Sequence, residues 1–126
     1  MADLAWETIG SRTSYSCEGF DIQTDDVRLP DGTETTFDYL TEPESVVVLP
    51  FRPDGEVVVI EEWRQAVGRV NRGLPAGNLE AGEEPAEAAH RELAEETGHE
   101  AEAVSHLTTV EPANGFADAV FHYYVA

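Results

Sequence analysis

One stretch of this chain, residues 85–97, has the composition of an α-helix, and strand-forming segments lie on both sides of it. Its residues are mostly strong helix formers. Pro85 suits the first turn of a helix, where a missing N–H costs nothing, and Gly98 supplies the stop that glycine commonly provides just past a helix end. A single helix between strands predicts a mixed α/β (α+β) domain.

The strand-forming segments are short and bounded by turn residues. Several short strands are predicted between residues 11 and 40, and further strands at 45–50, 56–60, 107–110 and 119–125. The runs 45–50 and 56–60 are apolar and β-branched, and they are too short for helices. The turn signal at 52–55 joins them into a predicted hairpin. The glycine-rich stretch 68–82 is expected to be a loop with a short strand.

Three carboxylates share one face of the predicted helix. At about 100° per residue, Glu92, Glu95 and Glu96 fall within an arc of about 100°. Like charges at this spacing disfavour a helix, and a divalent cation would turn their repulsion into attraction. Carboxylate oxygens suit Mg²⁺ or Mn²⁺. A solvated acidic face is the alternative, and the helix alone leaves both interpretations open.

The residues before the helix extend this pattern. The fixed positions are Gly77, Glu83, Arg91, Glu92, Leu93, Glu95, Glu96 and Gly98. Their spacing resembles the Nudix box, G-x5-E-x7-R-E-U-x-E-E-x-G-U, in which U is a bulky apolar residue. Only the last position departs, because His99 stands there. The resemblance implies a Nudix fold, in which a mixed β-sheet packs with a central catalytic helix in an α/β/α sandwich.

The resemblance also implies which residues do the chemistry. Glu92 and Glu96 are the metal-ligand candidates, and Glu95 is a ligand or the catalytic base. The main-chain carbonyl of Ala76 is a further ligand candidate. The implied cofactor is Mg²⁺, with Mn²⁺ as the alternative.

The spacing has a physical logic of its own. Gly77 allows a tight turn and close approach to a ligand. Arg91 can pair with Glu83 through a forked, charge-assisted contact that pins the loop to the helix. Leu93 can bury and anchor the helix. Glu80 and Glu83 are supporting candidates at the site.

Weaker matches extend over most of the chain. The segments 27–32, 62–69, 74–77 and 111–116 resemble the ADP-ribose pyrophosphatase branch of the family. That branch implies hydrolysis of ADP-ribose to AMP and ribose 5-phosphate. The substrate-binding candidates are Arg64, Glu80, Arg28 and Phe116. For Arg64 a surface salt bridge is the alternative, and for Phe116 a place in the core or an interface.

Some positions depart from that branch. Gly73 and Ala119 stand where it often carries glutamates, and the sequence stops at Ala126, before the usual distal glutamate and C-terminal helix. We therefore expect one Nudix domain over 1–126. In it, 1–44 would supply N-terminal strands that build a homodimer, and 45–126 a core without that helix. A truncated form or a minimal domain is expected.

The charge bears on partners rather than on the reaction. With 26 acidic and 7 basic residues, a net charge of −19 and no lysine, the chain would repel nucleic acid and anionic membranes. We expect a cytoplasmic protein with a nucleotide substrate, from a salt-loving source or simply acidic. Three other functions stay open: hydrolysis of another nucleotide (a nucleoside triphosphate or nucleotide sugar), a non-catalytic Nudix-like nucleotide-binding module, and an acidic interaction protein without a site.

Overall fold

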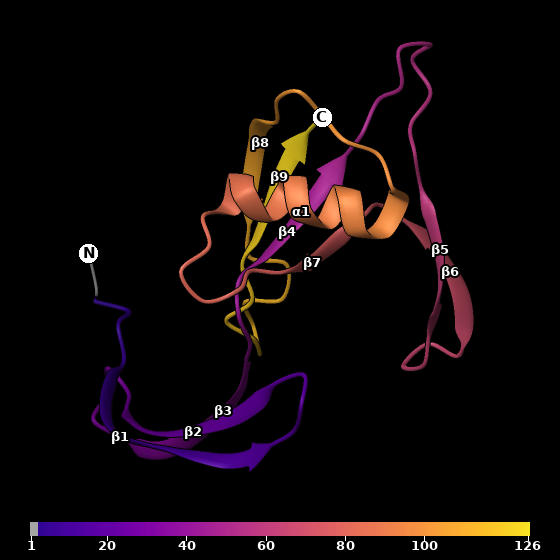
Figure 1. The fold of residues 1–126 in the computed structure, drawn as a ribbon. Coiled ribbons are helices and arrows are strands. Elements are labelled where there is room, and N and C mark those ends of the chain that lie inside the picture. Colours follow the sequence, from indigo (N-terminus) through magenta and orange to yellow (C-terminus); the bar gives the residue numbers. More distant parts are fainter. Residues whose placement is uncertain (1–2) are drawn as a thin grey trace. The chain divides into compact units, whose positions relative to one another are not determined.

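The computed structural model describes residues 3–126, so the first two residues of the predicted N-terminal segment lie outside it. Its elements, in chain order, are β1 (Glu7–Ser16), β2 (Asp21–Arg28), β3 (Glu34–Thr41), β4 (Ser45–Leu49), β5 (Ile60–Arg64), β6 (Arg69–Gly73), β7 (Ala76–Asn78), α1 (Pro85–Thr97), β8 (Ser105–Val110) and β9 (Phe121–Val125) (Figure 1). They form two compact units, 1–43 with 111–119, and 44–110 with 120–126.

The first unit is an antiparallel sheet in the order β1-β2-β3. The segment 111–119 is tied to the end of β3. The N–H of Leu40 donates to the carbonyl of Phe116 (2.8 Å), and the N–H of Asp118 donates to the carbonyl of Leu40 (3.0 Å). Val27 and Ala119 are the buried apolar side chains of this unit. The expected N-terminal strands are therefore present, with little apolar core of their own.

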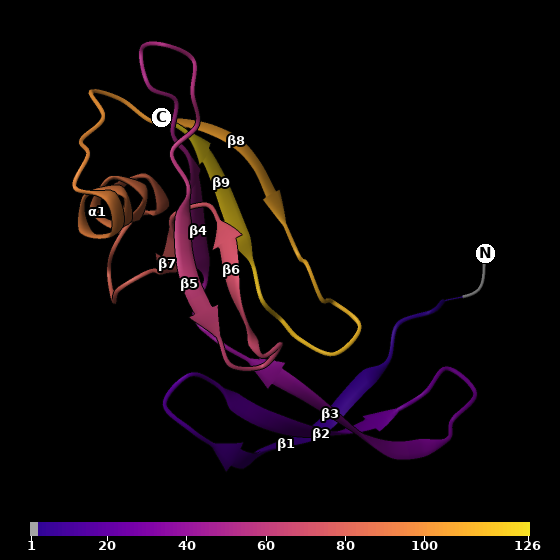
Figure 2. The same ribbon diagram turned by 90° about the vertical axis from the view of Figure 1, so that its right-hand side faces the viewer.

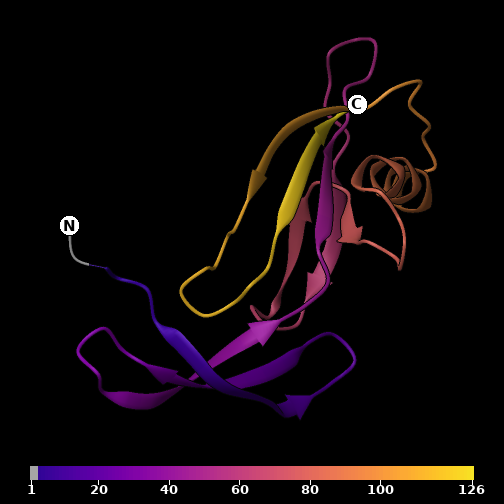
Figure 3. The ribbon, with the colours of Figure 1, turned by 90° about the vertical axis from the view of Figure 1, so that its left-hand side faces the viewer.

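The second unit holds a four-stranded mixed sheet in the order β7-β4-β9-β8. β4 and β9 are parallel, whereas β7 and β8 run antiparallel to their neighbours. Figure 2 shows α1 beside one face of this sheet, and Figure 3 shows the same arrangement from the opposite side. A separate two-stranded hairpin, β5-β6, lies in the same unit. The predicted mixed α/β class is confirmed, with α1 the helix of the described residues.

The predicted helix has the expected bounds. Pro85 lies in its first turn, and Gly98 ends it with a left-handed φ of 73° while donating its N–H to Ala94 (2.9 Å). Leu93 is 2% exposed, so it buries as expected. The apolar side of α1 packs on the sheet in a cluster of Val46, Val48, Ala88, Ala89, Leu93 and Tyr124. This packing fixes which helix residues face β7.

The predicted hairpin over 45–60 forms only around its turn. Both edges of β4 are occupied, by β7 and by β9, so no edge of β4 remains for the run 56–60. The two arms pair through the bridge between Phe51 and Val57 and through the N–H groups of Arg52 and Val58, which donate to the carbonyls of Glu56 (2.8 Å) and Pro50 (3.0 Å). Regular strand begins at Ile60. The predicted loop at 68–82 is also more regular than expected, since it contains β6 and β7.

No helix in residues 3–126 is long and apolar enough to cross a membrane.

Candidate active site

The side chain of Glu92, on α1, lies very close to the backbone of β7. A Cβ added at Gly77 would lie 2.6 Å from Oε2 of Glu92 and nearer still to Oε1. Glu92 is only 8% exposed, so its carboxylate is packed against the Gly77 backbone. The φ of Gly77 is outside the left-handed region, and the residue belongs to a strand. Glycine is therefore required here for space and not, as the sequence suggested, for a tight turn.

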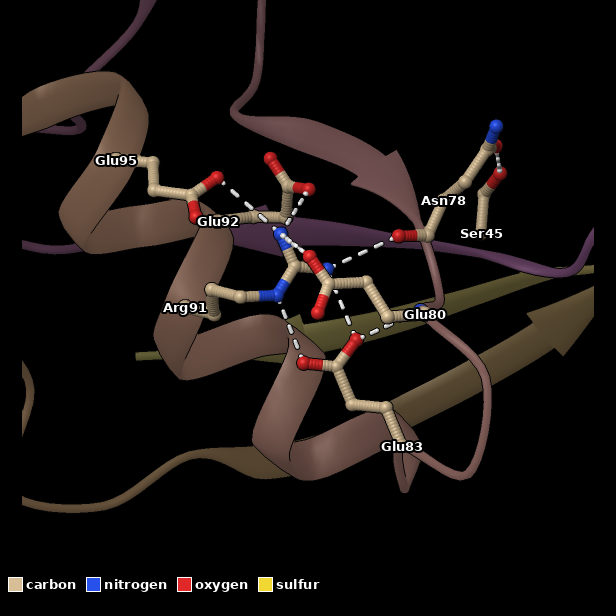
Figure 4. Close-up of polar contacts among 7 residues, drawn as sticks. All are labelled: Ser45, Asn78, Glu80, Glu83, Arg91, Glu92 and Glu95. Carbon is tan, nitrogen blue, oxygen red and sulfur yellow. Dashed lines mark hydrogen bonds and ion pairs between the residues drawn. The ribbon is translucent and has the colours of Figure 1, made fainter. Parts of the chain in front are cut away.

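The expected fork between Arg91 and Glu83 is present (Figure 4). Nε of Arg91 donates to Oε2 of Glu83 at 2.7 Å, and Nη2 donates to Oε1 at 2.9 Å. The N–H of Glu80 also donates to Glu83 (3.0 Å). These bonds, Arg91 foremost, lower the pKa of Glu83 to about 2, and they raise the pKa of Arg91. The loop before α1 is thus held to the helix by a carboxylate that stays ionised.

The same guanidinium reaches three further groups. Nη1 of Arg91 lies 2.9 Å from Oε1 of Glu92 and 3.2 Å from Oε2 of Glu95, while Nη2 donates to the carbonyl of Asn78 at 3.0 Å. Glu80 lies 3.7 Å from Nη1, at the limit of an ion pair. One side chain therefore connects the helix, the loop and the end of β7.

Glu96 joins Glu92 on the inner side of the helix. Burial, above all, raises the pKa of Glu96 to about 7. A hydrogen bond with Glu92 and the like charges of Glu92 and Glu62 add to the rise, and a main-chain hydrogen bond from Ala76 opposes it. Two acidic side chains thus share a partly buried space beside Ala76.

The predicted acidic arc divides into two parts. Glu92 and Glu96 lie together, whereas the side chain of Glu95 is 58% exposed and turned toward Arg91. Among residues 3–126, no three acidic, histidine or cysteine side chains are gathered into a ready metal cluster. Even so, two carboxylates held together behind the Gly77 backbone offer the hard oxygen donors that a divalent cation prefers. The residues fit such an ion.

The substrate-binding candidates are placed differently. Arg64, on β5, forms an ion pair with Glu62, and its side chain is 54% exposed. The negative charge of Glu62 helps to raise the pKa of Glu96, so this end of β5 lies near the acidic pair. Glu80 is 69% exposed on the loop before α1.

The other two substrate-binding candidates belong to the first unit. Arg28 is held between Glu7 (2.8 Å) and Glu34 (2.9 Å). Phe116 is 64% exposed, so it is not a core residue. It lines a cavity of about 270 Å³ with Phe37 and Tyr39, among others.

Sequence reasoning missed three residues near the site. Glu62 could have been found from its spacing, since in a strand it shares a face with Arg64. Ser45 and Asn78 gave no such signal, because their contact depends on how β7 pairs with β4.

Comparison with known proteins agrees with this geometry. The model of the NUDIX domain matches residues 41–126. An ADP-ribose pyrophosphatase of Bacillus subtilis is 34% identical over 126 residues, which is 100% of this chain and 68% of the relative. One of Mycobacterium tuberculosis is 34% identical over 127 residues, with 100% and 61% covered. A methanol dehydrogenase activator of Bacillus methanolicus is 36% identical over 120 residues, with 95% and 65% covered.

A solved structure also matches in fold. It is described as an ADP compounds hydrolase, with a TM-score of 0.86 at 23% identity, covering 98% of this chain and 68% of that one. The chain belongs to the NUDIX domain family, as its box predicted. It spans 61% to 68% of the length of the relatives named here.

Proposed function

We propose that this protein is a metal-dependent pyrophosphohydrolase that cleaves a nucleoside diphosphate linked to another moiety, with ADP-ribose as the first substrate. The products would be AMP and ribose 5-phosphate. The observation that carries the proposal is the packing of Glu92 against Gly77 with Glu96 beside it, because this places acidic oxygens together on a rigid helix. Two relatives at 34% identity are ADP-ribose pyrophosphatases, which supports the substrate.

Different residues would bind the metal, hold the loop in place and bind the substrate. Glu92 and Glu96, with the Ala76 carbonyl, would hold a divalent cation, Mg²⁺ first and Mn²⁺ second. When bound, the cation supplies neutralisation of phosphate charge and activation of water. Arg91 keeps the loop and helix in register through Glu83. Arg64 and Glu80 are the substrate-binding candidates of this unit.

A carboxylate near the proposed metal ligands would accept the proton from water. Glu95 is exposed on the same helix turn, so it can accept a proton as water attacks phosphorus. The new bond joins the water oxygen to phosphorus, and the bond to the bridging oxygen of the pyrophosphate breaks. The bridging oxygen leaves with the phosphate that is not attacked, and the two products are AMP and ribose 5-phosphate. Arg28 and Phe116 are proposed as substrate-binding residues from their resemblance to the ADP-ribose pyrophosphatase branch.

The first unit favours a homodimer. Few apolar side chains are buried in this unit, and several large ones are exposed to solvent. Leu4 is 80% exposed, Tyr15 58% and Trp6 51%. Trp6 packs edge-on against Phe37, with ring centroids 5.9 Å apart, and both rings remain partly exposed. Exposed apolar side chains on β1 and in the segment before it support an association surface. Light scattering on the wild type and on Trp6→Ala would test it, with a monomeric wild type as the contradicting result.

Two further features belong to the proposal. We infer a cytoplasmic protein, since its nucleotide substrate is found there. The net charge of −19 without lysine supports adaptation to high salt.

A phosphate-release screen tests the function. The panel contains ADP-ribose, nucleotide sugars and nucleoside triphosphates, each with Mg²⁺, with Mn²⁺ and with chelator. The proposal predicts metal-dependent AMP release that is fastest with ADP-ribose. A faster rate with another nucleotide would replace the substrate but keep the enzyme class. Nucleotide binding without hydrolysis would identify a binding module, and neither binding nor hydrolysis would leave an acidic interaction protein.

A further inference from the structure

Ser45 and Asn78 face each other across the β4–β7 pair. Ser45 is the first residue of β4, Asn78 the last of β7, and the two are direct register partners. Oγ of Ser45 donates to Oδ1 of Asn78 at 2.8 Å (Figure 4). Ser45 is only 7% exposed. A buried hydroxyl is costly without a hydrogen-bond partner, so the Asn78 amide is specified rather than incidental.

The two side chains lie away from the reacting groups. Val46 packs against α1, and successive strand residues point to opposite faces, so Ser45 projects from the other face of the sheet. This pair therefore lies on the face of the sheet opposite to α1 and Glu92. Its influence has to pass through the backbone of Asn78.

That backbone carries two functional contacts. The carbonyl of Asn78, on the outer edge of β7, accepts the Nη2 hydrogen bond of Arg91 at 3.0 Å. Gly77, the preceding residue, provides the surface against which the Glu92 carboxylate packs. A shift of the strand end would move both the acceptor of Arg91 and the surface behind Glu92.

Besides the Arg91 bond to Asn78, few contacts hold that end of β7. It is three residues long and pairs with β4 through three register positions, of which Ser45–Asn78 is the last. Beyond it, the N–H of Leu79 donates to the carbonyl of Glu44 (2.8 Å), and the loop begins. Short edge strands open at low free-energy cost. A side-chain hydrogen bond at the last register position opposes this opening.

We propose that Ser45 and Asn78 are positioning residues for the proposed hydrolysis, acting through the Asn78 carbonyl on Arg91 and through Gly77 on Glu92. The inference rests on the proposed function. It assigns to an ordinary strand pair the task of holding the metal-ligand carboxylate in place. Neither residue is a fixed position of the box.

The test compares Ser45→Ala and Asn78→Ala with Ser105→Ala. Ser105 also begins a strand of the same sheet, and it is exposed, so it is a matched control. Supporting partners of metal sites typically contribute roughly 10–100-fold to activity or metal affinity, and we expect a fall in kcat of that size in both variants, with KM for ADP-ribose little changed. Ser105→Ala should keep wild-type values. Ser45→Thr retains the hydroxyl and should restore most of the rate.

A second readout does not depend on turnover. The Mg²⁺-induced rise in Tm reports on the ligand carboxylates directly. The concentration of Mg²⁺ needed for half of that rise should increase in Ser45→Ala and Asn78→Ala, and the double variant should add little to either single one. A purely structural role would lower Tm equally with and without Mg²⁺ and leave that midpoint unchanged.

The outcomes distinguish the proposed function from the positioning role of Ser45 and Asn78. If the wild type hydrolyses no nucleotide, the proposed function fails. If the wild type is active and both alanine variants keep its kcat and its Mg²⁺ midpoint, the positioning role is overturned while the function stands. Should one alanine variant fail to fold, the other removes the same hydrogen bond and still tests the positioning role.

Discussion

Gly77→Ala tests the packing of the acidic pair most sharply. The added Cβ would lie 2.6 Å from Oε2 of Glu92. Non-bonded atoms of this size settle at about 3.5 Å, so the carboxylate has to withdraw by roughly 1 Å. A misplacement of about 1 Å can reduce turnover about 100-fold. We therefore expect kcat to fall by about two orders of magnitude.

The effect on stability should be smaller. Overpacking costs about 1–3 kcal/mol. The backbone of Gly77 lies outside the left-handed region, so alanine is compatible with it and recovers about 0.4–1 kcal/mol by restricting the unfolded chain. The net loss is therefore at most about 2.6 kcal/mol, which corresponds to a Tm lower by no more than roughly 10 °C.

Turnover and Tm should be measured on the same preparation, with Gly19→Ala as the control. A Cβ at Gly19 meets nothing within 4 Å, so that variant should match the wild type in turnover. A folded Gly77→Ala protein with wild-type turnover would refute the close packing of Glu92 on β7, or its part in catalysis.

Four further predictions concern charge. Arg91→Ala and Glu83→Gln break one fork, so their effects on turnover should be non-additive in a double-mutant cycle, and simple additivity would contradict the pairing. The pKa of Glu83 is lowered to about 2, so its ionised carboxylate stabilises the fold at any pH above the pKa of this group in the unfolded chain. That contribution is lost as pH falls toward 2. Acid unfolding of Glu83→Gln should not show this loss of stability. The effect of pH on stability has the opposite sign for Glu96, whose pKa is raised to about 7. Without metal, the wild type should lose stability as pH rises from about 4.3 to 7, whereas Glu96→Gln should not. A wild-type stability that does not change over this pH range would argue against the buried pair. Molar KCl shortens the screening length to about 3 Å, which weakens the repulsion between acidic groups at a net charge of −19. We therefore expect Tm to rise substantially with KCl. An equal Tm at low and high chloride would contradict the salt-adapted interpretation.

Local signals were sufficient for the helix and for part of the site. Pro85, Gly98 and the helix formers between them act within a few residues, so the bounds of α1 could be predicted. The fork from Arg91 to Glu83 could also be predicted, since it spans one loop and two helical turns.

Long-range pairing was not available from the sequence. β4 pairs with β9, from the far end of the chain, and this partner confines the expected hairpin to the residues around the turn at 52–55. The Ser45–Asn78 contact was missed for the same reason, because it follows from the register of β7 on β4. Helical angles placed Glu95 beside Glu92 and Glu96, but they could not show that Arg91 draws its side chain outward.

We propose that Glu92 and Glu96 hold the cation that hydrolysis requires. The decisive measurement is AMP release from ADP-ribose as a function of Mg²⁺ concentration, in the wild type and in Glu96→Gln. We expect a saturable dependence on Mg²⁺ in the wild type, and turnover lower by orders of magnitude in a Glu96→Gln protein that remains folded. Wild-type turnover in that folded variant, or AMP release that persists undiminished in chelator, would contradict it.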